Sequence, residues 1–485
     1  MELTLNIGVE RRFDMGSISK LKLNFIYNTS YQILKMLVPL VTTPYIARVL
    51  GPEGTGVYSY ANSIAAYFVM FAMLGINNYG NRSIAMVRDN SEKLSEKFWS
   101  IYFLQLITSA IVVVVYILYL CTICDDKRIG WILLIYVLSS ALDINWFFAG
   151  LENFRLIVFR NMFIQIFTVV LIFSFVKKAD DVYIYGLTYA SGAVIQQVIL
   201  WRYVHKKVTI VRVHWSDIVV HIKPVLILFV PLLAVSLYKV MDKIMLGWIS
   251  TKREVGYYEA CERICALPSG VIESLGSVML PRMANLFVKK EEDKSREYIY
   301  KSIMLAMFFS SAICFGLMSV SNEFVPLYYG AGYEKCILLF KILLPSSIFV
   351  SFANVIRTQY LIPREQDITY IISVSLGAVV NIVLNILLIP KMQSIGAAIG
   401  TLVAEMTVCV YQSIAVCRKL EIKKYLIETM PFIVAGTLMY GVVRSVQLQI
   451  ENMLVVLGTK ICIGALFYLG ITAIIVRKHM ENKLR

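Results

Sequence analysis

Residues 37–82 of the chain read LVPLVTTPYIARVLGPEGTGVYSYANSIAAYFVMFAMLGINNYGNR, and the outline of this stretch returns one half-protein later. Four of its features recur in the same order: Val38-Pro39-Leu40 as Val230-Pro231-Leu232, Gly56-Val57-Tyr58 as Gly256-Tyr257-Tyr258, Leu74-Gly75 as Leu275-Gly276, and Arg82 as Arg282. A hydrophobic hairpin repeated at this distance predicts two similar lobes of helices that face one another.

The composition is that of a protein embedded in a membrane. Hydrophobic residues make up 58% of the 485 residues, charged residues make up only 16%, and the mean hydropathy is +0.69. Apolar runs of about 20 residues, the length of a helix that crosses a bilayer, follow one another with short breaks. The sequence therefore predicts an all-α polytopic membrane protein of about fourteen transmembrane helices, with twelve as the alternative count.

The predicted spans cover residues 23–47, 57–78, 98–120, 130–150, 156–176, 182–203, 219–247, 255–280, 302–324, 336–358, 368–389, 395–417, 428–447 and 453–476. Lys and Arg concentrate in every second loop, above all in 202–223 and 282–301. The positive-inside rule places these loops, and with them both termini, in the cytoplasm. This bias accounts for most of the formal charge of +15 and leaves little support for nucleic-acid binding.

Six predicted spans separate the two copies of the hairpin, so the repeat keeps its orientation and is parallel. We expect two six-helix lobes around a central cavity, followed by two additional helices. The predicted divisions are a cytoplasmic N-terminal segment (1–22), an N-terminal lobe (23–203), a basic cytoplasmic linker (204–218), a C-terminal lobe (219–417), and two extra helices with a basic cytoplasmic tail (418–485).

The sequence holds no Walker A motif, no HExxH motif and no extramembrane segment large enough for a catalytic domain. The longest predicted outward loop is Asn322 to Lys335, and Cys121-x-x-Cys124 lacks the second pair of ligands that a zinc site needs. We therefore expect a transporter without a cofactor or ATP site, driven by the membrane potential or by a proton or sodium gradient.

Charged and polar side chains at membrane depth are costly unless they face a cavity or a partner, so they are candidates for function. The candidate substrate-binding residues are Asn28, Lys35, Arg48, Lys239, Lys243, Arg263 and Arg357. If these side chains face inward, the cavity is cationic and suits an anionic group such as phosphate.

All of these residues except Arg48 have a structural alternative. Asn28 can hold neighbouring helices together by a hydrogen bond. Lys35 can extend toward the membrane interface. Lys239 and Lys243 can be neutralised by Asp242, which shares one helical face with them. The set of Glu259, Glu262 and Arg263 can satisfy its own charges, and Arg357 can be a cytoplasmic anchor.

Acidic groups at membrane depth are candidates for ion coupling, and the residues alone indicate Asp143, Asp242 and Glu273. Asp143 precedes Trp146 and Phe147, so an aromatic surrounding favours exchange of a proton. The alternative for Asp143 is a structural pair with Arg155 or Arg160 of the next span.

Several motifs occur together over roughly residues 20–417. They are Pro44-Tyr45-x-x-Arg48-x-Leu50-Gly51, Gly54-x-Gly56-x-Tyr58, Leu74-Gly75-Ile76-x-x-Tyr79-Gly80-x-Arg82, Asp242-Lys243-Ile244-Met245-Leu246-Gly247, Val255-Gly256-x-Tyr258, Leu280-Pro281-Arg282, the run from Asn381 to Pro390, and the run from Ile395 to Thr401 with Glu405 beyond it. As a set they resemble the bacterial polysaccharide flippases, which are the O-antigen and capsule repeat-unit translocases of the multidrug/oligosaccharidyl-lipid/polysaccharide exporter superfamily.

This resemblance implies a flippase of the bacterial inner membrane. Its substrate would be an undecaprenyl-pyrophosphate-linked oligosaccharide, moved from the cytoplasmic to the periplasmic leaflet by alternating access for O-antigen, capsule or exopolysaccharide synthesis. The implied partners are this lipid-linked substrate and the membrane lipids, and the glycan polymerase of the same pathway is a further candidate. The alternative is an ion-coupled, multidrug-type antiporter of the same superfamily.

The resemblance also implies an ion site. The related lipid II flippases hold sodium with an Asp of span 7, an Asn and an Asp of span 11 and a Thr of span 12. Asp242, Asn381 and Thr401 match that set, but Asn385 stands in place of the second acid. Loss of one carboxylate weakens a site for a hard cation, and Glu405, one turn beyond Thr401, is a candidate substitute.

Overall fold

The first helix, α1 (Met15–Met73), turns back on itself at Gly51. Gly51 has φ 66° and ψ −178°, a conformation that glycine adopts without the steric cost of a side chain. Pro52 follows at once, where a helix start tolerates the missing N–H. The two arms of α1 correspond to the first two predicted spans, and the end of the molecule at which α1 turns is called the Gly51 end below.

The computed structural model describes residues 15–484. Within this range, the side chains of residues 15–33, 35, 36, 238, 239, 271, 277 and 475–484 are left undescribed. The remaining helices of the first half are α2 (Ile76–Val87), α3 (Ser91–Thr122), α4 (Lys127–Ser139), the short turn η1 (Ser140–Leu142), α5 (Asn145–Gly150), α6 (Phe154–Phe175), η2 (Ala179–Asp181) and α7 (Val182–Val204). A short helix, α8 (Trp215–Val219), lies between the halves.

The second half contains α9 (Ile222–Ile249), α10 (Lys252–Val288), α11 (Glu292–Ser319), α12 (Ser321–Tyr329), α13 (Lys335–Leu343), α14 (Ser346–Ile356), a π-helical turn η3 (Arg357–Leu361), η4 (Ile362–Arg364), α15 (Asp367–Met392) and α16 (Ser394–Val416). Two long helices follow, α17 (Ile422–Ser445) and α18 (Met453–Leu484). No strand occurs from residue 15 to residue 484.

Helix starts follow the sequence. The side chain of Asn90 accepts hydrogen bonds from the backbone of Glu92 and Lys93 at the start of α3, and Asp126 does the same at the start of α4. Such N-caps satisfy backbone N–H groups that have no partner within the helix. The structure adds detail to three predicted segments. The predicted spans 130–150 and 336–358 lie within the single apolar segments Lys127–Gly150 and Lys335–Arg364, the first interrupted at η1 and the second divided between α13 and α14. Most of α12 lies in the predicted loop Asn322–Lys335.

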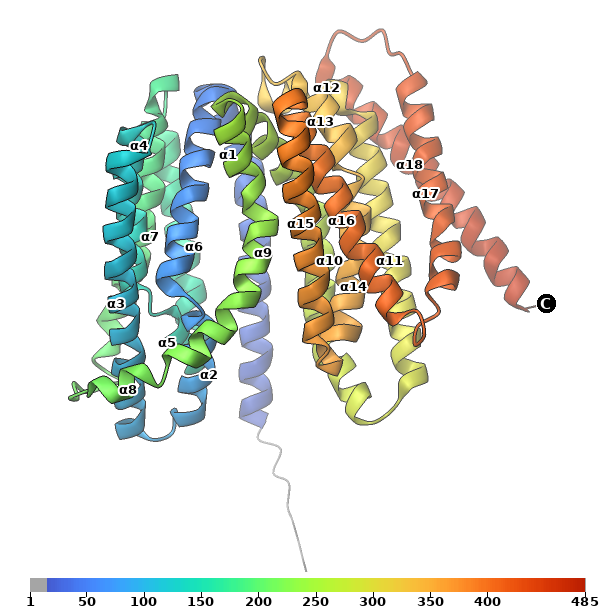
Figure 1. Cartoon of the computed structure of the whole chain (residues 1–485). Helices are drawn as coiled ribbons and strands as arrows, with labels where there is room; N and C mark the ends of the chain where they lie inside the picture. The colour runs from blue at the N-terminus through green and yellow to red at the C-terminus, as the bar shows by residue number, and fades with distance from the viewer. Residues whose placement is uncertain (1–14, 485) are drawn as a thin grey trace, which may run out of the picture.

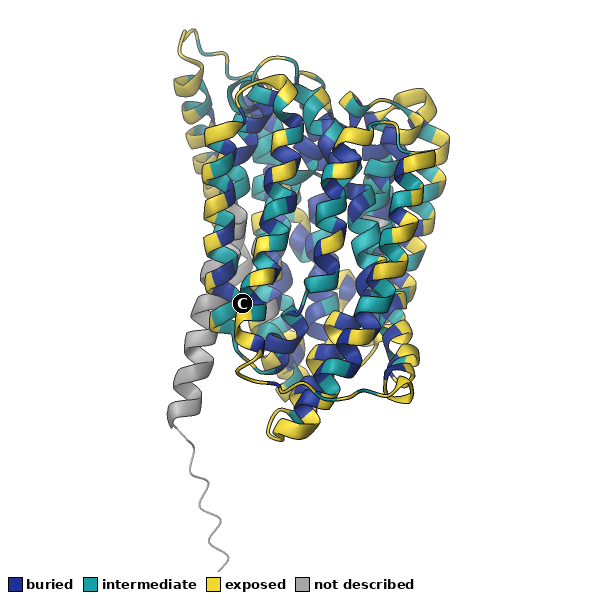
Figure 2. Ribbon diagram, turned by 90° about the vertical axis from the view of Figure 1, so that its left-hand side faces the viewer, coloured by how far each residue is buried: buried dark blue, intermediate teal, exposed yellow. Residues whose placement is uncertain are grey.

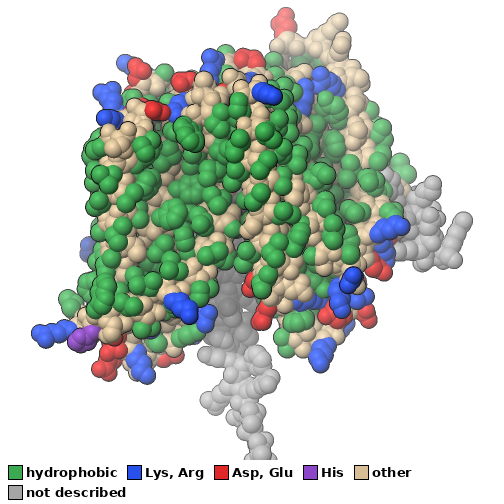
Figure 3. Space-filling model, viewed as in Figure 1, with side chains coloured by type: hydrophobic (Ala, Val, Ile, Leu, Met, Phe, Trp, Pro, Cys, Tyr) green, Lys and Arg blue, Asp and Glu red, His purple; other side chains and the backbone are tan. Residues whose placement is uncertain are grey.

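The surface is that of a protein in a bilayer. Figure 3 shows a hydrophobic belt between two edges at which Lys, Arg, Asp and Glu gather. Large apolar side chains are exposed along this belt, among them Ile111, Val114 and Leu118 of α3. In the part of the chain that is described, twelve segments are long and apolar enough to cross a membrane.

A helix lies at each of the fourteen predicted spans. The first of the twelve apolar segments, Leu37–Val87, contains the turn at Gly51 and therefore parts of two predicted spans. Helix α7 lies at the predicted span 182–203 but is not among the twelve apolar segments. The prediction of an all-α polytopic membrane protein is confirmed.

The helices form two halves side by side, with α1 to α7 in one and α10 to α16 in the other (Figure 1). Buried residues concentrate inside the helix bundle, and exposed residues lie on its outer faces and at its two ends (Figure 2). Helix α9 connects the halves. Near its start, Phe229 packs against Phe71 of α1, whereas further along Asp242 lies within the second half. The predicted domain boundaries therefore stay predictions, with the start of α9 lying against the first half.

The last two helices pack on the second half. A hydrophobic cluster joins Val320, next to α12, to Ala435 and Met439 of α17 and Tyr468 of α18. Lys460 of α18 also pairs with Glu323 of α12 at 2.7 Å, and both side chains are largely buried. Helices α17 and α18 are thus an addition to the second half and do not contribute to the contact between the halves described below.

Candidate site between the two halves

The two halves meet most closely where α1 crosses α10. A Cβ atom on Gly56 would lie 1.6 Å from the carbonyl oxygen of Lys252, and one on Gly256 would lie 1.9 Å from that of Pro52. Each glycine thus touches the carbonyl four residues before the other glycine. The sequence repeat had paired these two glycines, and the structure brings them into reciprocal contact.

Side chains reinforce this contact at the Gly51 end. The ammonium group of Lys252 lies 3.3 Å from the centre of the Tyr60 ring and 3.6 Å from the carboxylate of Asp125. The Tyr328 hydroxyl donates to the carbonyl of Leu40 at 3.0 Å. Farther from the Gly51 end, α1 and α10 carry exposed side chains, among them Leu37, Val41 and Glu273.

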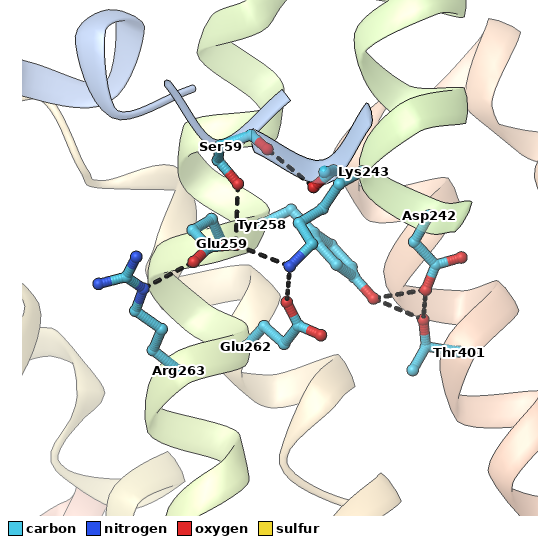
Figure 4. Close-up of polar contacts among 9 residues, drawn as sticks. Ser59, Asp242, Lys243, Tyr258, Glu259, Glu262, Arg263 and Thr401 are labelled. Carbon is cyan, nitrogen blue, oxygen red and sulfur yellow. Dashed lines mark hydrogen bonds and ion pairs between the residues drawn. The ribbon is translucent and has the colours of Figure 1, made fainter. Parts of the chain in front are cut away.

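One turn beyond the glycines, a cluster of four charged side chains lies beside the crossing (Figure 4). We call Lys243, Glu259, Glu262 and Arg263 the roof cluster. The Lys243 Nζ atom lies 3.0 Å from an oxygen of Glu259 and 3.0 Å from an oxygen of Glu262, and Arg263 Nε lies 2.6 Å from the other oxygen of Glu259. Ser59 of the first half donates to Glu259 at 2.9 Å.

The roof cluster differs from expectation in the partners of Lys243 and in its net charge. Lys243 is neutralised by glutamates of α10, and no ion pair joins it to Asp242 in the described part of the chain. The two cations of the cluster face two carboxylates, so the cluster carries no net charge. Within the set of Glu259, Glu262 and Arg263, Glu259 pairs with Arg263, whereas Glu262 pairs with Lys243 of α9.

Asp242 belongs to a second cluster, buried within the second half. One of its carboxylate oxygens accepts hydrogen bonds from the Tyr258 hydroxyl and the Thr401 hydroxyl, both at 2.6 Å. The other oxygen accepts from the amide of Asn385 at 2.5 Å, and the same amide lies 3.1 Å from the side-chain oxygen of Asn381. These five residues, from α9, α10, α15 and α16, are called the Asp242 cluster.

The Asp242 cluster fits a sodium ion in one arrangement of its amides. The Asn385 Oδ1 and Asn381 Nδ2 atoms are buried and have no hydrogen-bond partner. The oxygen and nitrogen of an amide are assigned from the hydrogen-bond network, so Asn385 can be turned by half a rotation. Its oxygen would then face Asp242, and a ring of carboxylate, amide and hydroxyl oxygens is the ligand set of a hard cation.

The other predicted residues lie apart from these clusters. Arg48 is exposed on α1 and donates to the carbonyl of Leu327 in α12, so it joins the halves at the Gly51 end. Arg357 lies on η3 and donates to the Tyr370 hydroxyl at 3.3 Å. The predicted candidates Asn28, Lys35 and Lys239 lie outside the described side chains.

The remaining acidic candidates are distributed over both halves. Asp143 accepts hydrogen bonds from the backbone and the side chain of Asn145, and the Asn145 oxygen accepts from Arg160 at 2.7 Å. Asn145 thus connects Asp143 to Arg160 by hydrogen bonds. Glu273 is exposed on α10, and Glu405 is half-buried on α16 one turn beyond Thr401.

Sequence reasoning missed Ser59 and Tyr258 as site residues. Tyr258 is fully buried, and it connects Asp242 to Thr401 because its hydroxyl lies 2.8 Å from that of Thr401. The repeat had paired Tyr258 with Tyr58, but this pairing did not indicate a role for Tyr258 in a site. Ser59 carried no signal, since its partner Glu259 lies in the other half.

Comparison with known proteins agrees with this arrangement. The family model described as "Polysaccharide biosynthesis protein" matches residues 21–287, more than half of the chain. The chain therefore belongs to this family, which confirms the resemblance inferred from its motifs.

Among proteins similar in sequence is the "Putative O-antigen transporter" of Escherichia coli strain K12, which is 26% identical over 399 residues, covering 79% of this chain and 94% of that protein. Among solved structures, the lipid II flippase MurJ in an inward closed conformation superposes with a TM-score of 0.74 at 17% identity, covering 94% of this chain and 99% of that one. An inward-facing multidrug resistance transporter of the MATE family and MOP superfamily superposes with a TM-score of 0.60 at 14% identity, covering 82% and 99%. These likenesses establish the fold.

Proposed function

We propose that this protein is a flippase for a lipid-linked glycan. It moves an undecaprenyl-pyrophosphate-linked oligosaccharide repeat unit from the cytoplasmic to the periplasmic leaflet, for synthesis of O-antigen, capsule or exopolysaccharide. Membership of the polysaccharide biosynthesis family supports this proposal, as do the similarity to the Escherichia coli relative and the fold shared with a lipid II flippase.

The observation that carries the mechanism is the asymmetry between the two ends of the molecule. The halves touch backbone to backbone at Gly56 and Gly256, near the Gly51 end, whereas α1 and α10 carry exposed side chains farther from that end. Two similar halves joined in this way can rock about their contact, so that access alternates between the two faces. The positive-inside bias favours a periplasmic location for the Gly51 end, so the close contact at Gly56 and Gly256 would close the periplasmic side in the present state.

Ion coupling is assigned to the Asp242 cluster. Asp242, Asn381, Asn385 and Thr401 would hold a sodium ion, whose charge would compensate the buried carboxylate. A proton on Asp242 would have the same effect on charge. Either way, the membrane gradient would act on α9, which contacts both halves.

The test is deletion of the gene followed by analysis of lipid-linked intermediates. We expect the undecaprenyl-pyrophosphate oligosaccharide to accumulate on the cytoplasmic leaflet and surface glycan to be lost, because synthesis continues while translocation stops. A plasmid carrying the wild-type gene should restore both. Normal surface glycan with no accumulated intermediate would overturn the proposal.

The alternative is an ion-coupled, multidrug-type antiporter. The charge balance of the roof cluster favours it, because a neutral cluster does not by itself attract an anionic headgroup. This function predicts that the deletion strain becomes sensitive to cationic drugs and leaves the lipid-linked intermediates unchanged, so the same strain distinguishes the two functions.

A further inference from the structure

The two carboxylates of the roof cluster are held very differently. Glu259 contacts Lys243, Arg263 and, across the halves, Ser59, and its side chain is 10% exposed. Glu262 has Lys243 as its only hydrogen-bond or ion-pair partner among the described residues, and its side chain is 35% exposed. Glu262 is therefore the carboxylate of this cluster that a ligand can reach and replace.

The position of Glu262 on α10 explains this difference. Gly256 touches the backbone of α1, and Glu259, about one turn later, still reaches Ser59 of α1. One further turn along, Glu262 and Arg263 are 35% and 29% exposed. Exposure thus rises along α10 beyond the contact between the halves, and the carboxylate of Glu262 is more accessible than that of Glu259.

The roof cluster has two cations and two carboxylates, so an anion can bind Lys243 only by displacing one of the carboxylates. Lys243 is shared between Glu259 and Glu262, so an incoming anion meets no unpaired cation in the cluster. Displacing Glu259 would break three contacts, one of them between the halves. Displacing Glu262 breaks one contact among the described residues, its ion pair with Lys243.

We propose that Glu262 stands in for the phosphate of the substrate. Its carboxylate occupies Lys243 while no substrate is bound, and a phosphate oxygen of the pyrophosphate takes its place at Lys243 while Glu262 turns toward solvent. The identity of this ligand rests on the proposed function. A multiply charged pyrophosphate outcompetes a single carboxylate for an ammonium group, whereas a neutral or cationic molecule does not.

This exchange makes the roof cluster selective without a net positive charge. An anion of low charge interacts with Lys243 more weakly than the Glu262 carboxylate does, so it does not displace this carboxylate. Glu259 stays in place throughout, because it also neutralises Arg263 and contacts Ser59.

The experiment measures binding of inorganic pyrophosphate to the purified full-length protein in nanodiscs. We expect E262Q to bind pyrophosphate about tenfold more tightly than wild type, because the competing carboxylate is gone while the side-chain shape is kept. E262A, which also removes the carboxylate, should show the same direction. Unchanged or weaker binding in both variants would overturn the proposal.

Two controls identify the source of the gain. K243Q should abolish it, so that the double variant E262Q/K243Q binds no better than K243Q alone. E297Q removes a carboxylate from an exposed i, i+4 pair with Lys301 in the same half, and it should bind like wild type. A gain of the same size in E297Q would mean that net charge alone is responsible, and the proposal would fail.

Comparison of nanodiscs separates pyrophosphate from lipid headgroups as the source of phosphate. The gain in E262Q should persist in phosphatidylglycerol and in phosphatidylcholine, and loss of the gain in phosphatidylglycerol alone would assign Lys243 to lipid headgroups instead.

A missing gain with normal accumulation of intermediates in the deletion strain would overturn the role of Glu262 and leave the proposed function intact. A clear gain with no accumulation would do the reverse.

Discussion

At the scale of single residues, two adjacent residues of α9, Asp242 and Lys243, contact two different clusters. Asp242 and Lys243 are neighbours in sequence, and successive residues of a helix point about 100° apart. Asp242 therefore faces Asn385 and Thr401, whereas Lys243 faces the glutamates of α10. Asp242 therefore belongs to the buried Asp242 cluster, whereas Lys243 belongs to the roof cluster.

The Asp242 cluster leads to a prediction about its asparagine. We expect N385D to bind sodium at least about tenfold more tightly than wild type, because a second carboxylate replaces the amide that now donates to Asp242. Without sodium, N385D should be less stable than wild type, because two carboxylates would face each other. The measurement is the melting temperature of the purified protein as a function of sodium concentration, with potassium for comparison.

A matched control separates this effect from a general change of charge. N452D makes the same substitution in the exposed segment between α17 and α18, and it should leave the sodium dependence unchanged. If N385D gives the wild-type sodium response, the Asp242 cluster does not hold the ion.

At the scale of elements, the crossing of α1 and α10 determines the state of the whole structure. Neither Gly56 nor Gly256 can carry a side chain here, since a Cβ would lie within 2 Å of a backbone oxygen. A carbonyl oxygen of a helix cannot move aside as a flexible side chain can. The present state therefore requires glycine at both positions, whereas a state in which the Gly51 end opens does not.

We accordingly predict that G56A and G256A shift the protein toward the state open at the Gly51 end. Spin labels at Glu53 and Trp248, which are exposed on opposite halves near the crossing, should report a longer distance in either variant than in wild type. Transport should fall at least about tenfold, because one state of the cycle is lost.

G441A is the matched control for these variants. Gly441 lies within α17, and a Cβ there would meet no atom within 4 Å. This variant should keep both the wild-type distance and the wild-type transport. A wild-type distance in G56A as well would show that the crossing is not the gate.

Much of this arrangement could be predicted from sequence, because helix position, repeat and motif are local properties. The turn at Gly51 and the pairing of Gly56 with Gly256 followed from the repeated hairpin. The approach of the two glycines could not be predicted, since backbone contact depends on how two helices cross. The partners of Lys243 were missed for a similar reason: they lie on another helix, and spacing along α9 says nothing about α10.

At the scale of the whole molecule, the two ends differ in both geometry and charge. The Gly51 end is closed, and the richest basic segments, 202–223 and 282–301, lie at helix junctions of the opposite end. The positive-inside rule makes the opposite end cytoplasmic. The direction of the proposed transport, from the cytoplasmic side across a closed periplasmic side, depends on this assignment.

Orientation is therefore the prediction on which the rest depends. A cysteine introduced at Gln447, in the segment between α17 and α18 at the Gly51 end, should react with a membrane-impermeant maleimide in intact spheroplasts, and a cysteine at Lys206 should react only after lysis. The reason is that most Lys and Arg lie at the end that contains Lys206, and translocating them across the membrane is unfavourable. The nine native cysteines need to be replaced first, because Cys121 and Cys417 are exposed. The reverse labelling pattern would make the Gly56–Gly256 crossing a cytoplasmic gate, and the present structure would then be closed on the cytoplasmic side.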